Sequence, residues 1–466
     1  MVFMKAGEDF KKIFLVLLPF LVVAVPTLFF YAFSTDEYTY MNTARSFSHG
    51  DFYNVEYPSR FPLFSVLLAI PFFFTGASEL VAKLVPIIFG ALAVLVVFEL
   101  GRRAYGTERG FWAGLAFSSV PAFAFLSTRV LSESLFVLLF TSCIFVLREI
   151  VIENRREKFW LLGALFGLLF LSRYNGLALA LVALICLWKY GQLNLLFSRR
   201  AAEGALAFLL VLSPWMYYSY SITGSPVGLA YDFARQQVHV GQQLFMALPD
   251  RLGVPGHNWD FFFTIPAPIG LMGFVSLAVV ILFISRKDFF RSICATCVEK
   301  NGFVFFAAFI SVYALNLAIS ILHPSLMRYL LPAAPFISLI VLGAINKNDL
   351  PKYTRTIRLA VIGNILLGLF LVSLFSPFAP VKIVSYEKQV LHREAALLAA
   401  NCSSIASNMR NPTLFYSGKN HTEISLLPEC IALSDFEGGY IGEVPQNEGY
   451  RKVFDQGGVR LYRRFQ

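Results

Sequence analysis

The sequence has few charged residues for its length. Asp, Glu, Lys and Arg make up 15% of the 466 residues, whereas hydrophobic residues make up 57% and the mean hydropathy is +0.64. A typical soluble protein carries about 25% charged residues. The shortage of charge excludes a soluble globular protein and indicates a chain whose main solvent is lipid.

Cysteine and histidine are also scarce, with six of each. Cys294 and Cys297 form a CxxC pair in a basic segment, and without a second pair or a nearby histidine they do not predict a zinc site. Cys402 and Cys430 lie in the polar C-terminal part of the chain. These two are able to pair as a disulfide if that part lies outside the cell.

Long apolar runs are abundant. A run of about 20 residues crosses the hydrocarbon core as a helix, which satisfies its own backbone hydrogen bonds. The runs lie at roughly 13–33, 79–100, 111–127, 131–147, 159–172, 175–190, 203–219, 264–284, 303–321, 329–345 and 359–376. A further run at 61–75 is expected to lie along the membrane interface. The predicted fold class is an all-α polytopic membrane protein with about eleven transmembrane helices.

Lysine and arginine are distributed unevenly among the loops. If the N-terminus lies in the cytoplasm, most of them fall in cytoplasmic loops, as the positive-inside rule requires. The segments predicted on the outer side are 34–60, 128–133, 172–174, 220–263, 322–328 and everything after about 377. The net charge of +10 is spread over short loops, which argues against nucleic-acid binding. The predicted location is the cell membrane, with the N-terminus cytoplasmic.

The last 90 or so residues lack long apolar runs. They contain an amphipathic helical pattern at 387–400 and strand-like pieces at 413–416 and 459–462, and two Asn-x-Ser/Thr sequons begin at Asn401 and Asn420. We therefore predict two domains, a transmembrane domain over 1–376 and a small soluble extracytoplasmic α/β domain over 377–466.

The first predicted outer segment carries two adjacent carboxylates, Asp36 and Glu37, directly after an apolar run. Carboxylates next to hydrocarbon are costly unless they are solvated, paired or bound to a cation. They suit a general base or a metal ligand. The alternative is that they solvate the end of a helix at the interface.

The same segment resembles the first external loop of GT-C glycosyltransferases, the family of dolichyl-phosphate-mannose protein mannosyltransferases and lipid A aminoarabinose transferases. The residues that carry this resemblance are Asp36-Glu37, Tyr40, Ala44-Arg45, Gly50-Asp51-Phe52 and Arg60-Phe61-Pro62-Leu63. Two later stretches are similar to the family as well, Arg173-Tyr174-Asn175-Gly176 and Arg328-Tyr329-Leu330-Leu331-Pro332. The family has Trp where this chain has Phe52, and Lys where it has Arg60. The resemblance extends over roughly residues 1 to 345 and implies a GT-C-like transmembrane domain.

The resemblance implies a membrane glycosyltransferase. It would transfer a hexose or pentose from a polyprenyl (dolichyl) phosphate to a hydroxyl of a glycan, lipid or protein acceptor on the extracytoplasmic face, with inversion. Such a reaction needs a base for the acceptor hydroxyl and cations for the departing phosphate. Asp36 is the predicted base and Glu37 its support. The predicted phosphate-binding residues are Arg60, Arg328, Arg173 and Arg45, for which snorkelling to lipid head groups is the alternative.

Four further residues are weaker candidates. Glu133 would ligate a metal or hold an arginine, or simply favour a helix N-terminus through the helix dipole. His323 and Tyr329 would support the donor side, although an interfacial histidine is more often structural. Glu56 is the possible ligand of a divalent cation, and whether a cation is required stays open. The loop at 220–263 is interpreted as a cover for the substrate.

A transporter or flippase of lipid-linked material is the alternative function. Transporters tend to have internal repeats, broken helices and charges near the middle of the membrane. This chain has its acidic residues near one face instead. The predicted partners in either case are membrane lipids and a polyprenyl-phosphate-linked molecule.

Overall fold

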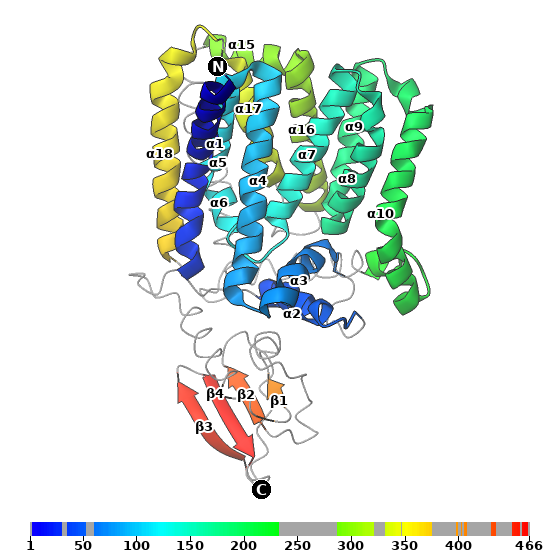
Figure 1. Cartoon of the computed structure of the whole chain (residues 1–466), viewed down its shortest axis with the longest axis vertical. Coiled ribbons are helices and arrows are strands. Elements are labelled where there is room, and N and C mark those ends of the chain that lie inside the picture. The colour runs from blue at the N-terminus through cyan, green and yellow to red at the C-terminus, as the bar shows by residue number, and fades with distance from the viewer. Residues whose placement is uncertain are drawn as a thin grey trace.

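The computed structural model describes most of the predicted transmembrane domain and parts of the C-terminal segment. The described residues are 2–29, 35–52, 60–232, 287–320, 331–345, 347–374, 398, 402, 405–407, 430–434, 450–456 and 459–464. Figure 1 shows long helices side by side in a bundle, with two helices lying across one end of it.

The helices follow the predicted apolar runs closely. In chain order they are α1 (Val2–Ala24), η1 (Val25–Phe29), α2 (Thr35–Ser48), α3 (Leu63–Thr75), α4 (Glu79–Tyr105), α5 (Thr107–Ser118), α6 (Pro121–Leu126), α7 (Glu133–Ile152), η2 (Arg156–Lys158), α8 (Phe159–Ser172), η3 (Tyr174–Leu177), α9 (Ala178–Lys189), η4 (Leu193–Phe197), α10 (Arg199–Thr223), α15 (Lys287–Val298), α16 (Lys300–Ser320), α17 (Ala334–Ala344) and α18 (Leu350–Leu374).

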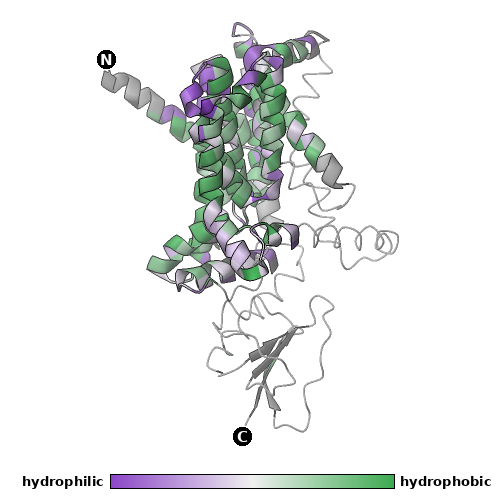
Figure 2. Ribbon diagram, turned by 90° about the vertical axis from the view of Figure 1, so that its right-hand side faces the viewer, coloured by the Kyte–Doolittle hydropathy of each residue, from purple (hydrophilic) through white to green (hydrophobic). Residues whose placement is uncertain are grey.

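Several of these helices are long and apolar enough to cross a membrane. Among the described residues four qualify alone, at Phe10–Leu28, Glu79–Tyr105, Glu133–Ile152 and Arg199–Thr223. A fifth candidate is the pair Arg291–Val298 and Lys300–Leu315, which is bent by 96°. Figure 2 shows hydrophobic residues along the middle of the bundle and hydrophilic residues at its ends. The chain is thus a multi-pass membrane protein, while the predicted run at 264–284 lies outside the described residues.

One predicted span is broken in the middle. The run at 111–127 forms α5 and α6, separated at Ser119 and Val120, and α6 begins with Pro121. Proline lacks a backbone N–H and favours the first turn of a helix, so α6 starts anew here. Ser119 Oγ accepts a hydrogen bond of 3.2 Å from Asn364 Nδ2 of α18, which holds the break against a neighbouring helix.

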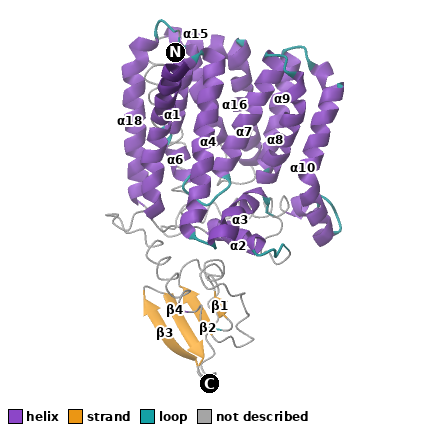
Figure 3. Ribbon diagram, in the orientation of Figure 1, coloured by secondary structure: helices purple, strands orange, loops and turns teal. Residues whose placement is uncertain are grey.

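The two helices across the end of the bundle are α2 and α3 (Figure 3). On α3, Phe64, Leu68 and Phe72 are buried, whereas Ile70 and Phe73 are exposed. One side of α3 thus packs on the protein and the other is apolar and open. This agrees with the interfacial position predicted for 61–75.

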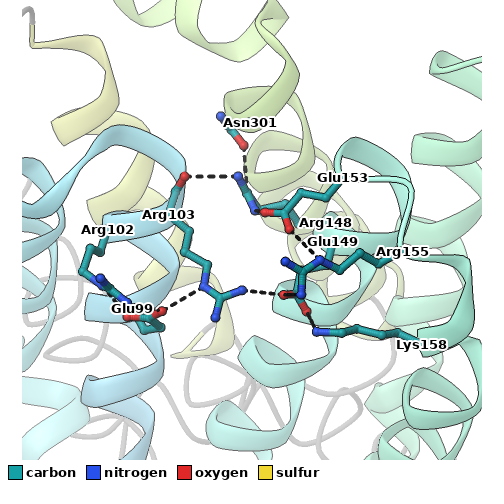
Figure 4. Close-up of polar contacts among 9 residues, drawn as sticks. All are labelled: Glu99, Arg102, Arg103, Arg148, Glu149, Glu153, Arg155, Lys158 and Asn301. Carbon is teal, nitrogen blue, oxygen red and sulfur yellow. Dashed lines mark hydrogen bonds and ion pairs between the residues drawn. The ribbon is translucent and has the colours of Figure 1, made fainter.

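The opposite end of the bundle carries a network of charged residues (Figure 4). Glu149, whose side chain is 1% exposed, lies 2.5 Å from both Arg103 Nη1 and Lys158 Nζ. Arg148 donates to Glu153 Oε1 at 2.6 Å and to Asn301 Oδ1 at 2.8 Å. The network joins α4, α7 and α16 and lies at the helix ends and connecting residues that the positive-inside rule assigns to the cytoplasm.

The C-terminal segment contains a four-stranded sheet. Its strands are β1 (Ile405–Ser407), β2 (Cys430–Ser434), β3 (Tyr450–Gln456) and β4 (Val459–Arg464), in the order β1-β2-β4-β3. β1 is parallel to β2, and the other pairs are antiparallel. The strand predicted at 459–462 lies in β4, whereas 413–416 falls outside the described residues, as does 387–400 apart from residue 398. Cys402 takes part in a disulfide bond.

Candidate active site

Three segments far apart in the sequence meet at the end of the bundle where α2 lies. They are the first turn of α2, the loop of residues 127–132 between α6 and α7, and Arg173 at the end of α8. Each of them falls in a segment predicted on the outer side of the membrane. Together with Arg60 and with Glu133 of α7, their acidic and basic side chains form three ion pairs.

The first pair joins Asp36 and Arg60. Arg60 Nη2 donates a hydrogen bond of 2.7 Å to Asp36 Oδ1. The guanidinium group also lies over the ring of Tyr40, 5.5 Å from its centre. The side chains of Asp36 and Arg60 are 37% and 27% exposed, so a molecule arriving from outside can reach both.

The second pair is buried. Glu37 is fully inaccessible and accepts two hydrogen bonds from the Arg129 guanidinium, from Nε at 2.9 Å and from Nη2 at 2.5 Å. The backbone N–H of Val130 donates a third, at 2.9 Å. Glu37 therefore does not share the exposed position of Asp36, although the two are adjacent in sequence. Consecutive helical residues point about 100° apart, and α2 turns Glu37 toward the protein.

The third pair joins Glu133 at the start of α7 and Arg173. Arg173 Nη1 lies 2.8 Å from Glu133 Oε1, and the two side chains are 14% and 4% exposed. Glu133 thus holds an arginine, which is one of the roles predicted for it. The same Nη1 lies 3.5 Å from Ser132 Oγ, which is in turn 3.4 Å from the Tyr40 hydroxyl. Tyr40 and Ser132 therefore lie between the first pair and the third.

Other predicted site residues are not brought to this place by the described structure. Arg45 lies nine residues after Asp36 on α2, about 13 Å further along the helix axis. Burial lowers the pKa of Arg45 from its usual value. Glu56, His323, Arg328 and Tyr329 lie outside the described residues. Their roles stay predictions.

No role was predicted for Arg129, Ser132 or the Tyr40 side chain. Arg129 is one of the few arginines in the segments predicted on the outer side, and that was the available signal for a special role. Its partner could not be identified from the sequence, because 92 residues separate Arg129 from Glu37.

The described residues do not present a metal site. They contain no group of three or more His, Cys, Asp or Glu side chains placed to hold an ion. Asp36, Glu37 and Glu133 are each bonded to an arginine instead. We therefore assign no step of the chemistry to a metal.

The site places the accessible carboxylate of Asp36 close to guanidinium groups at one end of the bundle. A carboxylate accepts a proton, and a guanidinium fork binds phosphate through two parallel hydrogen bonds. Both suit the transfer of a group away from a phosphate.

Part of the chain matches a protein-family model. Residues 58–218 match the family model described as dolichyl-phosphate-mannose-protein mannosyltransferase. The matched residues include Arg60, Arg129, Glu133 and Arg173. No curated protein sequence matches the chain.

Solved structures match nearly the whole length of the chain. ArnT from Cupriavidus metallidurans bound to undecaprenyl phosphate is 14% identical, with a TM-score of 0.68 and 98% of each chain covered. Its apo state gives a TM-score of 0.70 at 13% identity. The Archaeoglobus fulgidus oligosaccharyltransferase in complex with Zn and sulfate is 16% identical, with a TM-score of 0.51 over 82% of this chain and 55% of that one.

These matches establish the fold. The chain has the GT-C fold, so the resemblance predicted from its first outer loop is confirmed. Together the family match and the shared fold support a membrane glycosyltransferase as the general class of the protein.

Proposed function

We propose that this protein is an inverting glycosyltransferase that moves a sugar from a polyprenyl phosphate to an acceptor hydroxyl on the extracytoplasmic face of the membrane. The observation that carries the proposal is the accessible pair of Asp36 and Arg60, 2.7 Å apart, at the end of a bundle with this fold. The similar structure of ArnT holds undecaprenyl phosphate, which is a polyprenyl phosphate.

In the proposed reaction the acceptor oxygen attacks the anomeric carbon of the donor sugar, and its proton passes to the Asp36 carboxylate. The bond between that carbon and the phosphate oxygen breaks, and its electron pair leaves with the phosphate. Arg60 and Arg173 stabilise the negative charge that the phosphate gains. A single displacement of this kind inverts the configuration at the anomeric carbon.

The ion pair of Asp36 and Arg60 sets the order of donor binding and acceptor activation in the proposed reaction. Arg60 Nη2 lies 2.7 Å from Asp36 Oδ1 and so occupies the oxygen that would accept the proton. Binding of the donor phosphate draws Arg60 toward a second anion. Asp36 Oδ1 is then released to accept the proton of the acceptor hydroxyl, so activation of the acceptor follows binding of the donor.

The proposed orientation places α2, the 127–132 loop and the C-terminal sheet outside the cytoplasm. It is supported by the charged network at the opposite end, which contains Arg103, Arg148 and Lys158. The disulfide at Cys402 supports it too, since such bonds persist in oxidising compartments. We also propose the division into a transmembrane domain over 1–376 and a soluble domain over 377–466.

The substitution Asp36→Asn tests the function. Purified protein in liposomes would be given a panel of polyprenyl-phosphate hexoses and pentoses with candidate glycan, lipid and peptide acceptors. We expect transfer by the wild type and a loss of about 10²- to 10⁴-fold in Asp36→Asn, the usual contribution of a general base.

The matched control is Asp349→Asn. Asp349 is 38% exposed and pairs with Lys352 at 2.7 Å, but it lies in the segment before α18. It should transfer sugar as the wild type does. Unchanged turnover in a folded Asp36→Asn protein would reject Asp36 as the base. A wild type that moves lipid-linked sugar across the membrane and transfers none would favour the transporter.

A further inference from the structure

Beneath the accessible pair, four segments converge on a buried group of polar side chains. Glu37 from α2 and Arg129 from the 127–132 loop form its ion pair. Lys83 of α4 is 5% exposed and donates a hydrogen bond of 3.2 Å from Nζ to the carbonyl oxygen of Thr27 in η1. Lys83 is close enough to both Glu37 and Arg129 to interact electrostatically with each of them.

Arg129 is held firmly in this group. Two of its nitrogens bond the two oxygens of Glu37, a bidentate arrangement that sets direction as well as distance. Its guanidinium also lies 5.9 Å from the centre of the Phe125 ring, and its side chain is 12% exposed. A lysine in its place would keep the charge but lose the fork.

Two contacts tie α2 to the 127–132 loop, and both come from one face of the helix. Glu37 bonds Arg129 and Val130, and Tyr40, three residues later, lies 3.4 Å from Ser132. Residues three apart on a helix share a face. The loop leads directly into Glu133, which holds Arg173. The position of α2 and the position of the third ion pair are therefore set by the same loop.

We propose that Arg129 is a positioning residue of the active site, which acts through Glu37 to hold Asp36 toward Arg60 and in register with Glu133 and Arg173. The proposal rests on the function proposed above. Because Glu37 is anchored inward, its neighbour Asp36 is directed outward to the place where acceptor and donor would meet. Lys83 adds a second cation behind Glu37 and joins the end of the first helix to the same group.

Arg129→Gln tests this, with Arg129→Lys, Glu37→Asp and the exposed Arg199→Gln made alongside. Arg199 is 93% exposed and pairs with Glu203 on α10, so its loss should change nothing at the site. Two quantities are measured in detergent or liposomes. One is kcat and KM for a polyprenyl-phosphate sugar. The other is hydrogen–deuterium exchange of the peptide that covers residues 35–48.

We expect Arg129→Gln to lower kcat by about 100-fold, the loss that a displacement of about 1 Å causes, while KM for the donor changes less than about threefold. Exchange in 35–48 should rise. Arg129→Lys should recover part of kcat, and Arg199→Gln should match the wild type in both measurements. If Arg129→Gln does not fold, Glu37→Asp carries the test, because it keeps the charge and moves the anchor by one methylene.

Two outcomes overturn the proposal. Wild-type kcat and wild-type exchange in a folded Arg129→Gln or Glu37→Asp protein would show that the pair positions nothing. A fall in kcat with unchanged exchange would show that Arg129 acts on the substrate instead. Failure of the proposed function looks different, because the wild type would then transfer no sugar while exchange in 35–48 would still be faster in Arg129→Gln than in the wild type.

Discussion

The two ends of the helical bundle use the same carboxylate and guanidinium groups in different surroundings. At the end opposite the site, Glu149 and Arg148 of α7 are 1% and 5% exposed, and each bonds several partners drawn from α4, α16 and residues 153–158. At the site, Asp36 and Arg60 are 37% and 27% exposed. A buried, multiply bonded charge cannot exchange its partner for a ligand without a large cost, whereas an exposed pair can. Exposure, more than pairing, separates structural charges from those available for chemistry.

Glu149→Gln should give the largest effect on stability. The variant removes the buried carboxylate that holds Arg103 and Lys158, and a hydrogen bond to a charged group contributes about 1.5–3 kcal/mol to the free energy of unfolding. Unfolding of the purified protein in detergent would be followed by heating and by denaturant. The activity of the molecules that remain folded should be unchanged.

Glu203→Gln is the control for that experiment. Glu203 pairs with Arg199 and Arg200 on the surface of α10, where solvent screens the charges, so the unfolding midpoint should hardly move. If Glu149→Gln lowered the stability of the protein as little as Glu203→Gln does, the buried Glu149 charge would contribute no more to stability than an exposed one.

Arg60→Gln should reverse the pattern, with activity lost and stability kept. A hydrogen bond to a charged group contributes about 1.5–3 kcal/mol, so kcat/KM for the donor should fall by about 10- to 100-fold. The melting temperature should stay near that of the wild type, because water can solvate the released Asp36. Arg60→Lys should lie between the two, since it keeps the charge without the fork.

Arg200→Gln serves as the matched arginine for this comparison. Arg200 bonds Glu203 at 2.8 Å and is 52% exposed, but it lies away from the site. Its kinetics should be those of the wild type. An Arg60→Gln protein that unfolded while keeping its turnover would show that Asp36 and Arg60 are a structural pair.

The same contrast explains which features could be predicted from the sequence. Apolar length and the distribution of lysine and arginine act over whole segments, so they predicted most helix positions and grouped Asp36, Arg129 and Arg173 at one end. These features need no knowledge of what packs against what. The break before Pro121 was not predicted, because a proline alone does not mark one: Pro19, Pro86 and Pro214 lie inside the helices α1, α4 and α10.

The partners of individual charges could not be predicted. Asp36 and Glu37 are equivalent in the sequence, and their separation into an exposed and a buried carboxylate depends on which side of α2 meets the 127–132 loop. That packing is a tertiary property. The role of Arg129 depends on the same packing, because its partner Glu37 lies 92 residues away in the sequence.

Glu153→Gln should have the smallest effect on stability. The pH dependence of the melting temperature is the measurement that resolves it. The hydrogen bond from Arg148 lowers the pKa of the Glu153 carboxyl below its usual value of 4.5, partly offset by desolvation. A carboxyl whose pKa is lower in the folded state stabilises the protein above its unfolded pKa, and this contribution disappears as pH falls through the folded value.

Wild type should therefore be more stable than Glu153→Gln at pH 7, by less than about 1 kcal/mol for a pair that is partly open to solvent. The difference in melting temperature between the two proteins should shrink as pH falls below about 4.5. A difference that stayed constant with pH would mean that the Glu153 charge contributes nothing, and that Arg148 is held by Asn301 and the backbone of Arg103 alone.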